Sequence, residues 1–191
     1  MSSNNTGKTI ANAFKVLSET CENVDKLIQF LNAQAEEQGE YVPLTSKPLL
    51  RLRNSIFNDD YILVFQKKKD KNSLYVADIS LWDNTVKDDE ADEARIYISK
   101  YMYATALNLN NEPISKGDFW QFADPIWITE GITELEFNAE HYNGSVKDKT
   151  QAKTDYRSLQ HVVGFSVPLT DITSANAYDK IFGGFDTLAE K

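Results

Sequence analysis

The chain has 191 residues, of which 41% are apolar and 26% are charged, and its formal net charge is −9. These fractions resemble those of globular proteins and exclude wholesale disorder. No apolar run approaches the roughly 18 residues of a membrane span, and the polar start lacks the apolar stretch of a secretory signal. The single cysteine, Cys21, cannot form an internal disulfide. We therefore expect one cytoplasmic domain over residues 1–191, with residues 1–8 disordered.

The negative charge is concentrated in the middle of the chain. Residues 83–146 contain thirteen Asp and Glu against four Lys and Arg, whereas residues 1–82 and 147–191 are each neutral. The three tryptophans, Trp82, Trp120 and Trp127, lie in or beside this segment. An acidic, aromatic-rich surface favours a cationic or carbohydrate-like partner and repels nucleic acid.

Heptad spacing predicts a long helix over residues 9–38. Its apolar stripe consists of Ile10, Phe14, Leu17, Cys21, Val24, Ile28, Leu31 and Ala35. Such a stripe is typical of a coiled coil or dimer helix. Additional apolar residues (Ala13, Val16, Leu27 and Phe30) widen the arc and favour a helix that packs on the protein's own sheet. On this interpretation, Leu17→Asp would prevent folding, and the oligomeric state, which the sequence leaves open, is slightly more consistent with a monomer.

Strand patterns follow a linker that contains Pro43 and Pro48. Residues 61–67, 74–82 and 95–103 predict three strands of an antiparallel meander. Residues 126–129 and 132–138 predict a further hairpin, residues 142–157 a polar, mobile stretch with an Asn143-Gly144 turn, and residues 161–169 a last strand. A short helix over 174–182 is expected to stop at Gly183-Gly184. The predicted fold is α+β: a long amphipathic N-terminal helix packed on a mostly antiparallel sheet of five or six strands, with a short C-terminal helix.

None of the catalytic patterns that we considered is complete. A metal-dependent nuclease could use Asp59 or Asp60 with Asp78, but Ser80 stands where that motif requires a lysine. The two histidines, His141 and His161, do not have the spacing of a zinc site. We therefore predict no catalytic residues, no metal and no cofactor, and an enzyme is less favoured than a binding protein.

Aromatic and acidic residues supply the candidate binding site. Tyr97, Tyr101 and Tyr103 share one face of a predicted strand, and Glu134 and Glu136 share the exposed face of another. Tyrosine and tryptophan are enriched at interfaces, although the same tyrosines could instead cover the second face of the sheet. The full candidate set is Tyr97, Tyr101, Tyr103, Trp120, Trp127, Glu134, Glu136, Asp88, Asp89 and Glu90.

The leading functional hypothesis is a non-catalytic interaction protein, such as an adaptor, inhibitor or immunity-type protein, that docks a basic protein partner. Charge would raise the association rate, and buried aromatic side chains would hold the complex. The alternative is a small hydrolase that acts on a sugar-like substrate through carboxylates, including Glu130 and Glu134, near Trp120 and Trp127. Neither hypothesis involves nucleic acid or a membrane.

Overall fold

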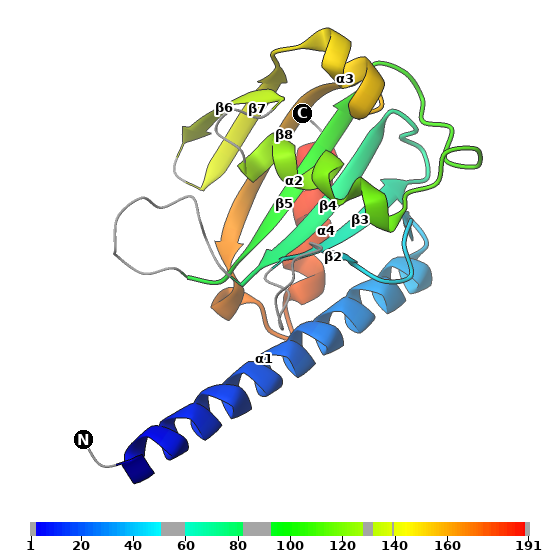
Figure 1. The fold of residues 1–191 in the computed structure, drawn as a ribbon. Coiled ribbons are helices and arrows are strands. Elements are labelled where there is room, and N and C mark those ends of the chain that lie inside the picture. Colours follow the sequence, from blue (N-terminus) through cyan, green and yellow to red (C-terminus); the bar gives the residue numbers. More distant parts are fainter. Residues whose placement is uncertain (1–2, 51–59, 82–92, 128–131, 139, 190–191) are drawn as a thin grey trace.

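The helices and strands follow the predicted α+β order. The computed structural model describes residues 3–50, 60–81, 93–127, 132–138 and 140–189. A long N-terminal helix, α1 (Ser3–Gln38), precedes an antiparallel sheet, and α4 (Ala177–Ala189) ends the chain (Figure 1). Helix α1 begins six residues before the predicted start at Thr9, so residues 3–8 form its first turns. Extending an existing helix is far easier than nucleating one, which favours this longer form.

The sheet has eight strands, more than the five or six predicted, and every described pairing is antiparallel. Its main path is β1-β3-β4-β5-β8-β7-β6, and β2 pairs with β3. The strands are β1 (Tyr41–Pro43), β2 (Leu49–Leu50), β3 (Asp60–Lys67), β4 (Ser73–Ser80), β5 (Arg95–Tyr103), β6 (Thr133–Asn138), β7 (His141–Val146) and β8 (Leu159–Pro168). The two additional strands at the start, β1 and β2, come from the linker that contains both prolines.

Helices cover both faces of the central strands. On the first face, Ile62, Val76 and Tyr101 belong to a core that includes Phe122 of α2 (Phe119–Trp127) and Ala152 of α3 (Lys149–Asp155). On the second face, apolar side chains of α1 and α4 pack against the sheet. Strands β3 and β4 are buried on both sides, which explains their continuous apolar sequences.

Among the described residues, the buried side chains of α1 all lie in its C-terminal half. Its stripe is buried at Val24, Ile28, Leu31 and Ala35. Every residue from 11 to 19 is exposed, and this half of the helix projects away from the sheet (Figure 1). The prediction that α1 packs on its own sheet is therefore confirmed: its buried contacts lie in residues 24–35, and Cys21 Sγ lies 4.0 Å from the Tyr61 hydroxyl of β3.

The predicted hairpin over 126–138 is wrong at residues 126 and 127, which are helical, and residues 128–129 of its predicted first strand lie outside the described part of the structure. Residues 119–127 form α2, because Phe119, Phe122 and Ala123 recur at helical spacing and bury one side of the helix. Strand β6 instead pairs with the following strand, β7, in the segment predicted to be polar and mobile. Gly144 lies within β7 opposite Leu135, and the Asn143-Gly144 pair is not a turn.

The polar segment after β7 is also ordered. Asp148 caps α3, and its carboxylate accepts hydrogen bonds from the backbone N–H groups of Thr150 (2.8 Å) and Gln151 (3.0 Å). At the C-terminus, α4 continues through Gly183 and Gly184, where the sequence predicts a stop. Gly184 has a packing role there, since an added Cβ would lie 2.8 Å from the Phe165 ring. A glycine at this position lets α4 approach the sheet closely.

Candidate functional site

The three candidate tyrosines of β5 lie in the core. Tyr97, Tyr101 and Tyr103 point to the first face of the sheet and are buried. The Tyr101 hydroxyl donates a hydrogen bond to the backbone oxygen of Phe122 at 2.5 Å, and the two rings meet edge to face at 5.6 Å. The structure thus matches the alternative interpretation, in which these rings belong to the core on one face of the sheet. A partner could reach them only if the covering elements moved.

A buried polar cluster adjoins these tyrosines. The hydroxyls of Ser99 and Tyr142 are 2.5 Å apart across the sheet. Burial raises the pKa of Tyr101 and of Tyr142, and the charge of Asp78 adds to both shifts. Both hydroxyls therefore stay protonated at neutral pH and act as structural hydrogen-bonding groups.

Two aspartates discussed as nuclease candidates are buried side by side in neighbouring strands. Asp60 of β3 pairs in register with Ser80 of β4, whose hydroxyl donates to the Asp60 carboxylate at 2.8 Å. Asp78 lies two residues before Ser80, on the same face of the sheet, and is 1% exposed. A serine replaces the lysine that would activate water, so this arrangement does not provide the nuclease chemistry.

The tryptophans and the acidic loop are only partly described. Trp120 is 47% exposed on α2, and its ring stands edge to face against Phe119 at 5.2 Å. The side chain of Trp127 and the residues Asp88, Asp89 and Glu90 lie outside the described part of the structure. Their proposed binding roles remain predictions.

Glu134 and Glu136 lie on an exposed face of β6, as the alternating pattern predicts. Strand β6 is at one end of the main sheet path. The two glutamates are two residues apart along the strand, which places their Cα atoms about 7 Å apart. The neighbouring strands complete a polar surface here, which we call the β6–β7 face: Glu134, Glu136, His141, Asn143, Ser145 and His161.

The β6–β7 face lies on the same side of the sheet as α1 and α4, but beyond the strands against which those helices pack. Helix α4 contacts β5, and Phe165 of β8 packs against the α4 core. One strand further, the outward side chains of β7 (His141, Asn143 and Ser145) are exposed. In Figure 1, β6 and β7 form an extension of the sheet away from α4.

Within this face, one row across three strands contains Glu134, Ser145 and His161. The Ser145 hydroxyl lies 3.3 Å from His161 Nδ1. The serine stands between the carboxylate and the imidazole, whereas a hydrolytic triad needs the imidazole in the middle. Partial burial lowers the pKa of His161, so the ring is neutral at pH 7. The row therefore supplies hydrogen-bonding groups and negative charge but lacks the order needed for nucleophilic catalysis.

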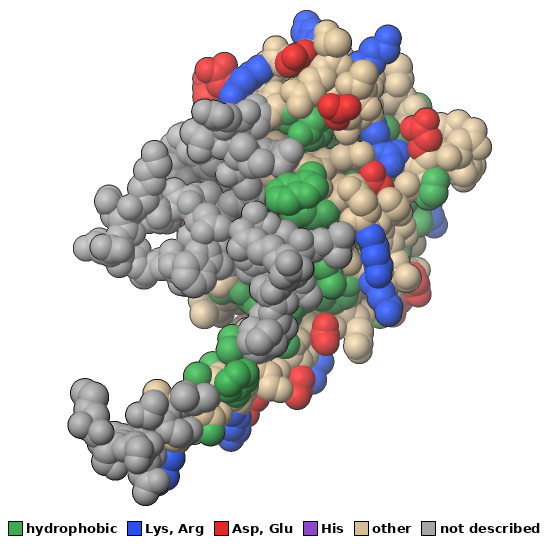
Figure 2. Space-filling view, in the orientation of Figure 1, with side chains coloured by type: hydrophobic (Ala, Val, Ile, Leu, Met, Phe, Trp, Pro, Cys, Tyr) green, Lys and Arg blue, Asp and Glu red, His purple; other side chains and the backbone are tan. Residues whose placement is uncertain are grey.

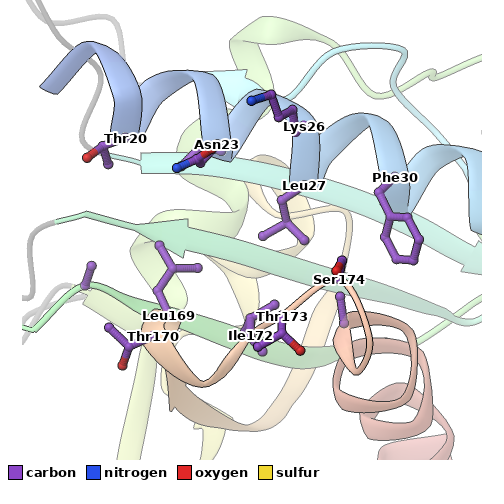
Figure 3. A pocket seen from close by; sticks show the side chains of 13 residues that line it. Thr20, Asn23, Lys26, Leu27, Phe30, Leu169, Thr170, Ile172, Thr173 and Ser174 are labelled. Atoms are coloured by element: carbon purple, nitrogen blue, oxygen red, sulfur yellow. The ribbon is translucent and has the colours of Figure 1, made fainter. Parts of the chain in front are cut away.

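An apolar groove of about 600 Å³ opens beside α1 (Figure 3). Leu27 and Phe30 of α1 line one side, and Leu169 and Ile172, which follow β8, line the other. The sequence did not reveal this groove, because its two sides are more than 130 residues apart in the chain. Glu134 and Glu136 do not line it, so the carboxylates of the hydrolase hypothesis do not meet there.

Among the described residues, no group of three His, Cys, Asp or Glu side chains could hold a metal ion. None of the helices in that same part of the chain is long and apolar enough to cross a membrane. No protein-family model matches this chain, and no curated protein or solved structure matches it significantly.

Proposed function

We propose that this protein is a non-catalytic interaction protein that binds a basic protein partner through the β6–β7 face. The observation that carries the proposal is the pair Glu134 and Glu136, two exposed carboxylates on one side of the terminal strand of the sheet path. Glu140, which follows β6, is also exposed, and its carboxylate forms an ion pair with Arg95 at 3.4 Å.

The chemistry of this face suits recognition of cationic side chains. Carboxylates about 7 Å apart match the spacing of alternate residues in an extended chain, so an extended segment with alternating Lys or Arg could pair with both. The hydroxyl and amide groups of Ser145 and Asn143 would supply further hydrogen bonds. Exposed ion pairs contribute little individually, so specificity depends on several acting together.

The acidic residues Asp88, Asp89 and Glu90 remain part of this proposal as a steering charge. Long-range attraction would speed the encounter with a basic surface, and added salt would screen it. Trp120 is an exposed aromatic ring in the same acidic segment of the sequence, on a helix that covers the opposite face of the sheet. It would contribute to binding only if the partner also extends to α2.

The test measures binding of a fluorescently labelled oligo-lysine peptide by anisotropy over a range of salt concentrations. The variant Glu134→Gln/Glu136→Gln removes two charges from the β6–β7 face while preserving side-chain size. We expect its affinity to fall about tenfold at low salt and its salt dependence to weaken, as expected for the loss of two favourable ion pairs.

A matched control removes two charges elsewhere. Glu36 and Glu37 are exposed near the end of α1, so Glu36→Gln/Glu37→Gln makes the same change in net charge. We expect this control to bind the peptide within about twofold of the wild type. Equal loss in both variants would show that only net charge matters, and an unchanged affinity in the first variant would exclude the β6–β7 face.

A further inference from the structure

A pocket of about 540 Å³ lies between α3 and the ends of β7 and β8. The last described pair between these two strands is Ser145 with His161, and α3 connects the strands beyond that point (Figure 1). We call this the α3 pocket. Its lining combines buried and half-buried residues with exposed polar ones, among them Val146, Lys149, Lys153, Ser158, Leu159 and Gln160. The volume is in the range of small-ligand sites.

Two lysines of α3 give the pocket a positive charge. Lys149 and Lys153 lie on the same side of the helix, about 6 Å apart along its axis. Figure 2 shows basic side chains (blue) at the end of the molecule where α3 lies. None of the described residues that line the pocket is acidic, and within the described part of the chain neither lysine forms an ion pair. In contrast, Lys67, Arg95 and Arg157 are each paired with two carboxylates.

The placement of these lysines does not stabilise α3 itself. Like charges four residues apart weaken a helix, and Lys149 stands in the first turn, where the helix dipole favours negative charge. Asp148 precedes Lys149, but its carboxylate accepts hydrogen bonds from the backbone N–H groups of Thr150 and Gln151. An anion held between the two lysines would offset their repulsion.

The chain that follows α3 is irregular where it borders the pocket. Ser158 has a φ of 63°, a left-handed conformation that non-glycine residues rarely adopt. Gln160 is the extra residue of a bulge in β8, because the residues on either side of it, 159 and 161, pair with two consecutive residues of β5. Irregularities of this kind cost stability and recur at functional sites, where they change the direction of side chains. Here both residues line the pocket.

We propose that the α3 pocket binds a small phosphorylated sugar or polyol, with the phosphate between Lys149 and Lys153. Lysine ammonium groups bind phosphate as point charges. The rest of the lining suits a body with hydroxyl groups, because Ser158 and Gln160 can both donate and accept hydrogen bonds. The buried Leu159 offers apolar surface to the C–H groups of the same ligand.

The charges around the pocket determine which way the ligand lies. Glu134 of β6 pairs in register with Ser145, which is on the sheet side of the pocket. Its negative charge repels a phosphate there and leaves the lysine side to the anion. The phosphate site does not depend on the basic partner proposed for the β6–β7 face, because both lysines lie outside that face.

Isothermal titration calorimetry of the full chain at low salt tests the proposal. The probes are ribose 5-phosphate, glucose 6-phosphate, inorganic phosphate and glucose. We expect at least one of the two sugar phosphates to bind about tenfold more tightly than inorganic phosphate, and glucose not to bind. Lys149→Gln/Lys153→Gln removes both charges and should weaken binding of that sugar phosphate by at least about tenfold. Both lysines are exposed, so this variant should keep its fold, which thermal unfolding checks.

Lys68→Gln/Lys69→Gln is the matched control. These two lysines are exposed in the turn between β3 and β4 and do not line the pocket, so the variant makes the same change in net charge elsewhere. We expect it to bind within about twofold of the wild type. Equal affinities of the two variants, or sugar phosphates that bind no more tightly than inorganic phosphate, would overturn the proposal. Tighter binding of a phosphoserine peptide than of either sugar phosphate would overturn the choice of a small ligand.

Discussion

At the residue scale, Gly164 of β8 leaves room for the Tyr142 ring. A Cβ at this position would overlap the Tyr142 ring carbon and hydroxyl and would lie 2.5 Å from the backbone oxygen of Ile98. The glycine therefore allows Tyr142 to lie flat across β8 and bring its hydroxyl to Ser99. This contact attaches the β6–β7 extension to the central strands, so it supports the proposed binding face.

We predict that Gly164→Ala destabilises the protein by about 1–3 kcal/mol, as other overpacked cores do. Gly183→Ala is the control, because an added Cβ there meets nothing within 4 Å and the residue lies in α4. Alanine is the better helix former, so this control should be neutral or stabilise by up to about 1 kcal/mol. Urea unfolding of both variants measures the difference. Equal stability of the two would contradict the described packing of Tyr142.

At the element scale, Arg157 holds the long connection between β5 and α2. Its guanidinium donates to Gln121 (3.0 Å), to the backbone oxygens of Glu112 (2.7 Å) and Pro113 (3.3 Å), and to Asp118 (3.4 Å). Arg157 has a φ of 53° and the following residue, Ser158, a φ of 63°. Non-glycine residues rarely adopt this left-handed conformation. This conformation changes the chain direction after α3 and directs the Arg157 side chain toward the connection between β5 and α2.

We predict that Arg157→Ala lowers the free energy of unfolding by about 2 kcal/mol, since it leaves partly buried acceptors, including the Asp118 carboxylate, without their donor. Lys153→Ala, on the exposed side of α3, is the control and should change stability by less than about 0.5 kcal/mol. Limited proteolysis should cut the Arg157→Ala protein faster within residues 104–118. Unchanged stability and cleavage would show that other contacts hold this connection.

The elements that the sequence predicts correctly are those with a strong local pattern. Heptad spacing identifies α1, and continuous apolar residues identify β3 and β4. The errors of prediction arise where contacts between distant parts of the chain determine the secondary structure. Gly144 obscures the alternating pattern of β7, because a glycine contributes no apolar side chain. Gly184 interrupts the apolar pattern of α4, but the helix continues through it and packs closely on Phe165.

The candidate site is predictable to a similar extent. The alternation around Glu134 and Glu136 places both on an exposed face, and the structure confirms their exposure. Their neighbours could not be predicted, because His161 reaches Ser145 only through the pairing of β7 with β8. Whether the tyrosines of β5 lie in the core or on the surface could not be predicted for a related reason. Only the presence of α2 above them decides whether that face of the strand is core or surface.

At the scale of the whole molecule, the β6–β7 face and the two helices α1 and α4 lie on the same side of one sheet but over different strands. The face extends beyond the strands that these helices cover, so a partner could reach it without displacing either helix.

Hydrogen exchange measured by mass spectrometry tests this account most directly, because it locates the surface that the partner covers. Added oligo-lysine peptide should slow exchange in residues 133–146, and salt should reverse that effect. Peptide-dependent protection that appears elsewhere, with none in residues 133–146, would contradict the account.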